Sequence, residues 1–329
     1  MVAPQCKRIP WSSNEMRIVF IGASQFGLKC LQEVRNLENC EIVGIVTAPQ
    51  KFNISYNPKG VVNVLHANVK EYALEYQIPC REIDQGMKDE SLFAEVCSWK
   101  PDIFLVVGWY HMVPRNWREV ASAFGLHASL LPDYSGGAPL VWAIINGENK
   151  TGITFFQFND GVDNGPIVGQ AETNINNDDT IATLYSRIED LGLDLIRENL
   201  PKLADGTANF LEQDEVNRRI FPQREPKDGE IDWQKPAIEI YNFVRAQTRP
   251  YPGAFTLFNG KQLKIWDVRL CDSIASSNIR PGEVLLNTES MLVKTGSGVL
   301  EVKAASIDDE SFNGFQIREF IDGGSKLGS

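Results

Sequence analysis

The stretch MRIVFIGASQFGLKCLQEVRNL, residues 16–37, indicates the fold class of this chain. Its first seven residues form a run rich in β-branched side chains that ends in glycine, which is typical of a buried strand followed by a turn. Apolar side chains then recur at helical spacing, at Phe26, Leu28, Leu31, Val34 and Leu37. The pattern predicts a strand, a glycine turn and a helix.

The same signals recur through the first half of the chain. Strands are predicted at 41–49 and 101–109, and a helix is predicted at 62–76. Strands that alternate with helices favour an α/β fold with a doubly wound, mostly parallel, Rossmann-like sheet. Ligands bind such sheets beyond the carboxyl ends of the strands. We therefore expect the loops after the first strand, after Val107 and after His127 to line one crevice.

A second, smaller domain follows a polar stretch. The helical pattern at 179–203 ends at Gly206, and apolar runs later flank Asn259-Gly260, the strongest short-range signal for a β-hairpin. A second pair of apolar runs surrounds Gly296 and Gly298. The sequence thus predicts a loose extension at 1–15, an α/β domain at 16–206, a linker at 207–227 and an antiparallel β-barrel of OB type at 228–329.

The composition narrows the class of protein. The 329 residues include 32 Lys and Arg against 43 Asp and Glu, and this net charge of -11 does not favour a nucleic acid as partner. The six cysteines form no CxxC pair and no cluster with histidine at zinc spacing, so neither a disulfide scaffold nor a metal site is indicated. No apolar run approaches the roughly 20 residues of a membrane span. These features predict a cytoplasmic protein with no metal and no membrane partner.

His127 is one of only three histidines and stands between an apolar run and a loop of Ser, Pro, Gly and Asp. Asp163 lies in a turn-rich loop after the apolar run 152–158, so we expect both residues at strand ends that face the same crevice. A carboxylate holds a histidine in one tautomer and raises its basicity, which a general base near neutral pH requires. A structural histidine and a turn-forming aspartate remain open alternatives.

The segment LHASLLPDYSGGAPLVWAIINGENKTGITFFQFNDGVDNGPIVGQ, residues 126–170, resembles the signature region of formyltransferases that use 10-formyltetrahydrofolate. In that family a histidine begins an HxSLLP loop, and an aspartate follows 36 residues later, as Asp163 follows His127 here. The similarity includes FIGASQFG at the first turn, VVGWYHMVP at 106–114, and motifs within 231–266. It covers nearly the whole chain after residue 16.

The resemblance implies transfer of a formyl group from the folate N10 to a primary amine by direct attack. His127 would take the proton of the amine as general base, Asp163 would orient the ring and stabilise the imidazolium, and no metal would be needed. The folate would lie along Val107, Gly108, Trp109, Tyr110, His111 and Met112, with Leu131, Asp160 and Gly161. The acceptor would lie near Gly22, Ser24, Ser129, Gly136 and Gly137.

Gly125 departs from the family pattern, which has a third catalytic residue, an asparagine, two positions before the histidine. Loss of one donor to an oxyanion typically costs about 10²–10³ in rate. We expect an ordered water in the space left by the missing side chain, or protonated His127, to donate instead. Backbone groups and His111 are further candidates, and a folate-binding protein with weak or no catalysis is the alternative from another functional class.

The family includes enzymes that act on amino sugars linked to nucleotides, on methionyl-tRNA and on a purine precursor, and the C-terminal domain disfavours the single-domain purine enzyme. A tRNA-binding enzyme is expected to carry a basic surface. The insertion at 50–64 offers only Lys51 and Lys59, and residues 228–329 hold 11 Lys and Arg against 14 Asp and Glu. We therefore expect a nucleotide-linked amino sugar as acceptor, with methionyl-tRNA as the alternative. Sugar-acting relatives often form homodimers, and the sequence leaves the oligomeric state of this chain open.

Overall fold

The computed structural model describes residues 15–54, 57–84, 86–271, 278–286, 290–308, 310–317 and 321–328. The extension expected at 1–15 therefore lies outside the described residues except for Glu15. The chain divides into two compact units. The first contains the residues up to Ser135 together with Gly152–Glu172 and Ile188–Arg219, and the second contains Gly136–Thr151, Thr173–Arg187 and the residues from Ile220 onward. The domain boundaries expected at 206 and 228 stay a prediction.

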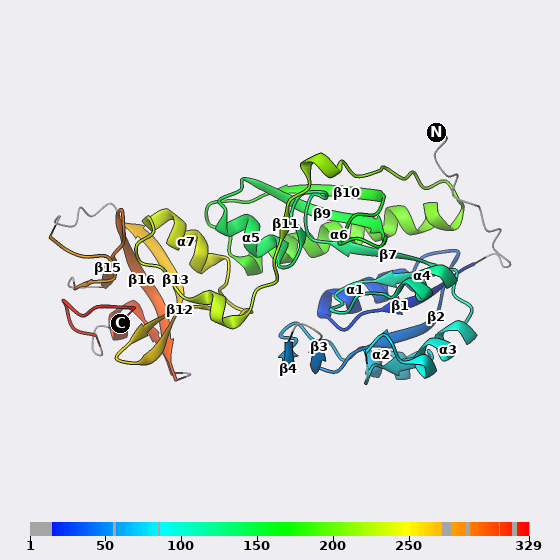
Figure 1. Ribbon diagram of the computed structural model, residues 1–329, viewed down its shortest axis with the longest axis horizontal. Coiled ribbons are helices and arrows are strands. Elements are labelled where there is room, and N and C mark those ends of the chain that lie inside the picture. Colours follow the sequence, from blue (N-terminus) through cyan, green and yellow to red (C-terminus); the bar gives the residue numbers. More distant parts are fainter. Residues whose placement is uncertain are drawn as a thin grey trace. The chain divides into compact units, whose positions relative to one another are not determined.

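Figure 1 labels the helices and strands in chain order. Up to the long helix α6 they are β1 (Met16–Ile21), α1 (Gln25–Val34), β2 (Cys40–Thr47), β3 (Lys51–Ile54), β4 (Asn57–Val62), α2 (Val69–Glu75), β5 (Cys80–Glu82), α3 (Glu90–Ser98), β6 (Ile103–Val106), α4 (Arg115–Val120), β7 (Ser122–His127), β8 (Ser135–Gly136), α5 (Pro139–Ile145), β9 (Lys150–Gln157), β10 (Ile167–Asn174) and α6 (Ile181–Ala204). They are followed by η1 (Glu215–Asn217), β11 (Ile220–Phe221), η2 (Pro226–Gly229), α7 (Ala237–Arg245), β12 (Ala254–Phe258), β13 (Lys261–Cys271), β14 (Val284–Leu286), β15 (Met291–Lys294), β16 (Val299–Ile307), β17 (Glu310–Asn313) and α8 (Gly314–Ile317).

A seven-stranded sheet with the strand order β10-β9-β7-β6-β1-β2-β5 forms the frame of the first unit. The strands β5, β2, β1, β6 and β7 are parallel, and β9 is antiparallel to β7. The apolar side chains of β1 are buried along its length because the strand lies between β2 and β6. Figure 1 shows α2 and α3 beside β2. The mostly parallel α/β sheet predicted from the sequence is confirmed.

The helix predicted at 62–76 begins later than expected, because Val62 belongs to a strand. β3 and β4 pair as an antiparallel hairpin, and α2 starts only at Val69, after Asn68 caps it by accepting the N–H of Glu71. Apolar spacing at 62–66 looked helical, but the local strand pairing takes precedence over that periodicity. The prediction of one long helix here was wrong in its start.

The second unit is built on an antiparallel sheet with the order β12-β13-β16-β15-β14, and β17 also pairs with β16. Asn259 and Gly260 connect β12 to β13 and both have positive φ angles, of 50° and 74°, as a tight two-residue hairpin turn requires. β15 and β16 form the second expected hairpin. The predicted antiparallel barrel-type domain is confirmed, in the form of a half-barrel.

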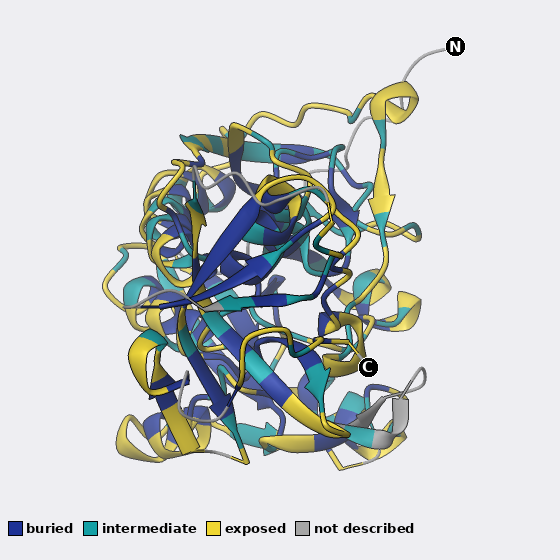
Figure 2. Ribbon diagram, turned by 90° about the vertical axis from the view of Figure 1, so that its left-hand side faces the viewer, coloured by how far each residue is buried: buried dark blue, intermediate teal, exposed yellow. Residues whose placement is uncertain are grey.

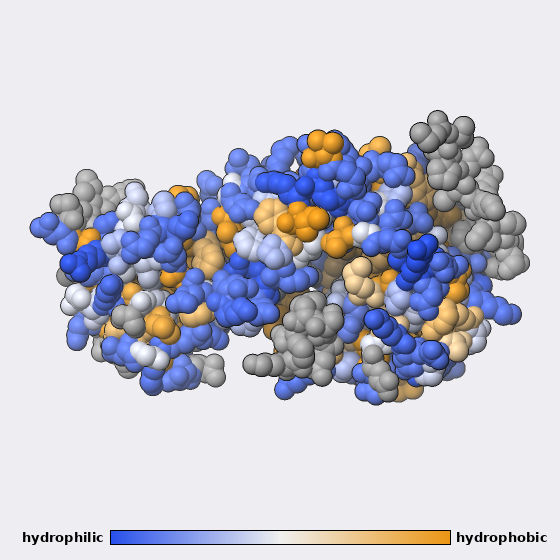
Figure 3. Space-filling view, in the orientation of Figure 1, coloured by the Kyte–Doolittle hydropathy of each residue, from blue (hydrophilic) through white to orange (hydrophobic). Residues whose placement is uncertain are grey.

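Burial follows the strands in both units. Figure 2 shows dark blue, buried residues concentrated in strands, and yellow, exposed residues in turns and on outer helix surfaces. The core of the second unit packs α7 against its sheet, through side chains that include Ile240, Val244, Ile265 and Leu300. Hydrophilic side chains cover most of the face drawn in Figure 3. Among the described residues, no helix is both long and apolar enough to cross a membrane.

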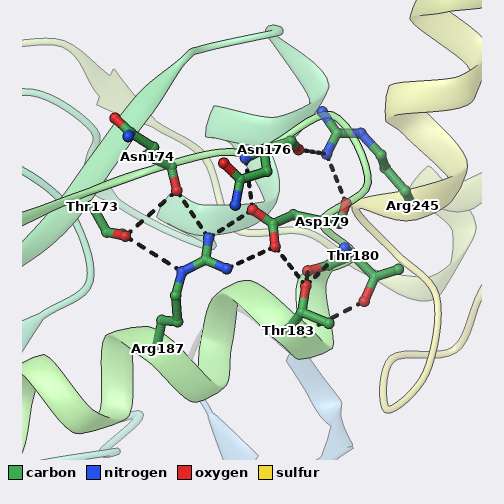
Figure 4. A network of polar contacts seen from close by, with 8 residues as sticks. All are labelled: Thr173, Asn174, Asn176, Asp179, Thr180, Thr183, Arg187 and Arg245. Carbon is green, nitrogen blue, oxygen red and sulfur yellow. Dashed lines mark hydrogen bonds and ion pairs between the residues drawn. The ribbon is translucent and has the colours of Figure 1, made fainter.

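A buried carboxylate fixes the start of α6 within the second unit. Asp179 is only 4% exposed and binds the Arg187 guanidinium through both oxygens, at 2.8 and 2.6 Å (Figure 4). The hydrogen bonds from Arg187 hold the pKa of Asp179 down at about 2. Thr180 then caps the helix by accepting the N–H of Thr183, and Arg245 donates to the Asp179 carbonyl. Thr180 is therefore the N-cap of α6.

Asp179→Asn is expected to destabilise the protein by about 1.5–3 kcal/mol near neutral pH, because the charged hydrogen bonds to Arg187 are lost. The folded pKa is depressed, so the contribution of Asp179 is complete above its unfolded pKa and is lost as the pH falls toward 2. Denaturant unfolding measured at several pH values should therefore show the gap between wild type and variant closing as the pH falls. Asp178→Asn, at the exposed neighbour, is the control and should follow the wild type.

Candidate active site

The carboxyl end of β6 packs directly on the turn between β1 and α1. Gly108 has a φ of +62°, and a Cβ at this position would lie 1.8 Å from the Ser24 Oγ. A Cβ on Gly22 would lie 2.4 Å from the Val107 carbonyl oxygen. Both glycines are therefore needed for the close approach of the two loops.

An aromatic cluster occupies the loop after β6. The ring centroid of His111 lies 5.4 Å from the centroids of both Trp109 and Phe52, and Tyr110 lies 5.3 Å from Phe52. Burial lowers the pKa of the His111 imidazole. The side chain of Met112, in contrast, is 67% exposed. The loop therefore offers aromatic rings and one exposed thioether.

Three buried polar atoms, in this loop and in the loop after β9, have no hydrogen-bond partner within the described part of the chain. They are the Trp109 Nε1, the His111 Nε2 and the Asn164 Oδ1. Buried polar groups are normally hydrogen-bonded, so unpaired ones require an explanation, such as a contact that a ligand completes.

His127 is the last residue of β7, and the loop that follows it contacts its ring. Its Nε2 lies 2.8 Å from the Tyr134 carbonyl oxygen, and its side chain is 12% exposed. The loop between these residues is anchored to β9, because the Thr154 hydroxyl donates to the Ser129 carbonyl and accepts the Leu131 N–H. The loop backbone therefore sets the orientation of the imidazole.

Asp163 reaches His127 by a route that the sequence did not indicate. β9 is antiparallel to β7, and His127 pairs with Thr154 in the middle of β9. The carboxyl end of β9 therefore lies beside the start of β7, far from His127. The expectation of two strand ends facing one crevice was therefore wrong. Residues 158–166 return along the sheet instead, and the Asp163 Oδ2 lies 3.5 Å from the His127 Nδ1.

The space beside Gly125 is filled by an aromatic ring. A Cβ at this position would lie 2.6 Å from the Phe158 ring and 2.6 Å from the Val106 carbonyl oxygen. The expectation that the missing asparagine leaves room for an ordered water is contradicted by this packing. Backbone groups at Gly125 are also committed, because its strand pairs with β6 on one side and β9 on the other.

A cavity of about 380 Å³ lies between α4 and the loop after β9. It is lined by Arg115, Arg118, Glu119, Asn159, Asp160, Gly161 and Asn164. Arg118 donates to the Asp160 carboxylate at 2.7 Å and thereby lowers the pKa of this exposed carboxyl. Asp160 and Gly161, expected at the folate site, therefore line this cavity.

The residues expected to bind the acceptor have structural contacts of their own. Ser24 is 2% exposed and caps α1 by accepting the Gly27 N–H, and Ser129 is 1% exposed and donates to the Asp133 carbonyl. Within the second unit, Gly137 donates its N–H to the Phe221 carbonyl. Gly136 lies against that same residue, since its Cβ would approach the Phe221 oxygen to 2.4 Å.

Several residues of the site carried no sequence signal. Phe158, Thr154 and the Tyr134 carbonyl act through contacts that depend on how the loops pack, and no local motif marks them. Across the described residues there is no group of three or more His, Cys, Asp or Glu side chains placed to hold a metal ion.

Comparison with known proteins assigns the family. Residues 16–200 match the formyl transferase family model, and residues 224–323 match the model of the formyl transferase C-terminal domain. The chain belongs to the formyl transferase family. It is therefore a formyltransferase, and the formyl donor of this family is 10-formyltetrahydrofolate.

Relatives of this formyltransferase include two bacterial enzymes named methionyl-tRNA formyltransferase. The protein from Caldanaerobacter subterraneus is 30% identical over 315 residues, which cover 94% of this chain and 97% of the relative. The protein from Clostridioides difficile is 32% identical, covering 88% and 91%. The crystal structure of an N-formyltransferase from Helicobacter canadensis, in complex with folinic acid and dTDP-3-aminofucose, has the same fold, with a TM-score of 0.64 and 18% identity over 87% of this chain and 98% of that one.

Gly125→Ala in this formyltransferase is expected to cost about 1–3 kcal/mol of folding stability, because the added methyl would overlap the Val106 carbonyl and the Phe158 ring. Equilibrium unfolding in denaturant measures this cost. In a Phe158→Ala background, the additional cost of Gly125→Ala should be smaller but not zero, since the contact with the Val106 backbone remains. A Gly125→Ala variant as stable as wild type would show that the packing at β7 is looser than described.

Proposed function

We propose that this formyltransferase uses His127 as its proton-accepting base and Asp163 to stabilise the resulting imidazolium. The observation that carries the proposal is the 3.5 Å approach of the Asp163 Oδ2 to the His127 Nδ1, in a chain that belongs to the formyl transferase family. The pair is part-buried, with side chains 12% and 23% exposed, so water screens it only partly.

The contacts of the imidazole assign its two nitrogens different roles. A neutral ring carries one N–H, and the Tyr134 carbonyl at 2.8 Å accepts it from Nε2. Nδ1 then holds the lone pair that can accept a proton, next to the Asp163 carboxylate. After proton transfer both nitrogens donate, one to Tyr134 and one toward Asp163. Tyr134, rather than Asp163, therefore orients the ring in this proposal.

The transfer requires one proton to be moved. 10-Formyltetrahydrofolate supplies an activated formyl carbon. The amine nitrogen of the acceptor forms a bond to this carbon, and the bond between the carbon and N10 of the folate breaks. His127 takes the proton from the amine and returns it to N10. Gly125 contributes no donor, and both N–H groups of the imidazolium are already used by Tyr134 and Asp163. The imidazolium would therefore stabilise the developing oxyanion by its charge alone, and His111 is the candidate donor.

We place the folate at the aromatic loop, and the unpartnered polar atoms there support this position. Trp109, Tyr110 and His111 would face the pterin, because their rings cluster and two of their ring nitrogens lack partners within the described chain. Val107 and Leu131 are buried and would support the site, whereas Met112 is exposed. The cavity at Asp160 and Gly161 would hold a further part of the folate, and the glycines and serines expected at the acceptor site remain proposed contacts.

His127→Asn is expected to lower kcat by about 10²–10⁴, because the base is lost, while the KM for the folate stays within about twofold. Asp163→Asn should lower kcat by a smaller factor, since it removes charge but keeps shape. The kcat of each variant is measured from the absorbance change on release of tetrahydrofolate, with the acceptor at saturating concentration. A His127→Asn enzyme with the wild-type rate would refute the assigned role.

We further propose methionyl-tRNA as the acceptor, in place of the amino sugar favoured by charge counts. The relatives named for this activity match the chain over 88–94% of its length. In the second unit, the Arg249 guanidinium lies 4.8 Å and the Lys264 ammonium 5.7 Å from the Trp266 ring centre. Cations beside an aromatic ring are a combination that nucleic-acid-binding surfaces use. Other cations of the same sheet are paired with carboxylates, as Lys261 is with Asp308 and Arg269 with Glu301.

A nucleotide-linked amino sugar remains the second candidate. The observation that favours it is the likeness in fold to the Helicobacter canadensis N-formyltransferase, whose structure contains dTDP-3-aminofucose. The net charge of -11 also suits a small acceptor better than a polyanion.

Salt dependence separates the two acceptors. If methionyl-tRNA is the acceptor, its affinity should fall steeply between about 50 and 200 mM salt, because phosphate binding releases counterions. Arg249→Ala and Lys264→Ala should each reduce the slope of log affinity against log salt by about 1. Lys261→Ala, which removes a cation already paired with Asp308, is the matched control. Absent tRNA binding together with formylation of a dTDP-amino sugar would favour the second candidate.

A further inference from the structure

The segment Gln213–Arg219, which the sequence predicted to be linker, contacts both loops of the His127 and Asp163 pair within the first unit. We call it the latch segment. Its central side chain is Arg218, which is only 9% exposed. The Arg218 Nη1 donates to the Ser135 Oγ at 2.8 Å and to the Val162 carbonyl at 3.0 Å. Ser135 follows Tyr134 in the His127 loop, and Val162 precedes Asp163.

Gln213 ties the latch segment to the Asp163 loop a second time. Its Nε2 donates to the carbonyl oxygens of Asp163 and Gly165, each at 2.7 Å. Its Oε1 accepts from Arg218 at 3.1 Å, so the amide is oriented by the same guanidinium. The Glu215 carboxylate accepts two further hydrogen bonds from Arg218, at 2.7 and 2.8 Å, and so neutralises the charge of the guanidinium.

Arg219 ties the latch segment to the His127 loop. Its guanidinium binds the Asp133 carboxylate through two contacts of 2.6 Å and lies 4.8 Å over the Tyr134 ring. Its carbonyl accepts the Ser135 N–H at 3.0 Å. The carbonyl of Tyr134 is the group that holds the His127 ring.

We infer that Arg218 is a positioning residue for formyl transfer, since its guanidinium joins the two loops whose separation sets the distance from His127 to Asp163. Five hydrogen bonds from one little-exposed guanidinium converge on these loops and on the groups that support them. Misplacement of a catalytic group by about 1 Å can cost 10²-fold in rate. The inference rests on the proposed roles of His127 and Asp163.

Arg218→Met tests the inference in the full-length chain, with amide hydrogen exchange and steady-state kinetics as readouts. Exchange should accelerate at least about 10-fold in residues 128–135 and 159–165 and stay unchanged in the strands of the sheet. The kcat should fall by about 10- to 100-fold, with the KM for the folate within about twofold. A general loss of stability would instead raise exchange throughout the chain.

Arg197→Met is the matched control. Arg197 also forms a two-point ion pair, with Glu33 at 2.7 and 3.0 Å, but on the α1 and α6 surface of the same unit. It should leave the exchange of both loops and kcat unchanged. Unaltered loop exchange in Arg218→Met would overturn the inference, and so would an unaltered kcat.

Two gentler variants keep the test decisive if Arg218→Met does not fold. Arg218→Lys retains the charge but loses the planar fork, so it should keep only part of kcat. Gln213→Ala should accelerate exchange in 159–165 alone, because it removes donors to that loop only. Wild-type behaviour of both variants would overturn the inference.

His127→Asn, assayed in parallel, separates the two proposals. If it retains the wild-type rate, the proposed catalytic role is wrong, whereas the exchange data still report on the latch segment without any turnover. If His127→Asn is inactive and Arg218→Met matches the wild type in both readouts, only the positioning role fails.

Discussion

The site depends on two loops that must meet although their strands run in opposite directions. β7 ends at His127, whereas β9 is antiparallel to it and leaves the sheet at the other edge. Residues 158–166 form neither helix nor strand, yet they place Asp163 within 3.5 Å of the imidazole. A return loop of this kind lacks a backbone ladder to fix it, so side-chain hydrogen bonds to its carbonyl groups have to supply the order.

The proposed site contains polar groups that have hydrogen-bond partners and others that lack them within the described residues. Thr154, Gln213 and Arg218 use their polar atoms on loop backbone, and this satisfies groups whose burial would otherwise cost stability. The Trp109 and His111 ring nitrogens, in contrast, lack partners within the described residues. The Asn164 Oδ1, in the loop that holds Asp163, also lacks a partner within the described residues. A protein tolerates that cost where a ligand completes the contacts.

The net charge and the named relatives favour different acceptors. An excess of acidic residues opposes binding to a polyanion on average, but affinity depends on the few cations that reach phosphate groups. In the second unit many cations are neutralised by nearby carboxylates, while Arg249 and Lys264 share the ring of Trp266. The net charge counts every cation alike. Only the structure shows which cations pair with a carboxylate and which lie beside an aromatic ring.

The sequence by itself determined the alternation of strands and helices in the first half of the chain, the parallel sheet, the Asn259-Gly260 hairpin and the His127 and Asp163 motif. Periodicity, turn chemistry and motif spacing are properties of the sequence alone. The tertiary structure decided the return of the Asp163 loop, the filling of the Gly125 site by Phe158, and the contacts of Arg218 with both loops. These features are contacts between side chains and loop backbone far apart in the sequence. They have no local pattern, because they depend on which loops the packed sheet brings within hydrogen-bonding distance.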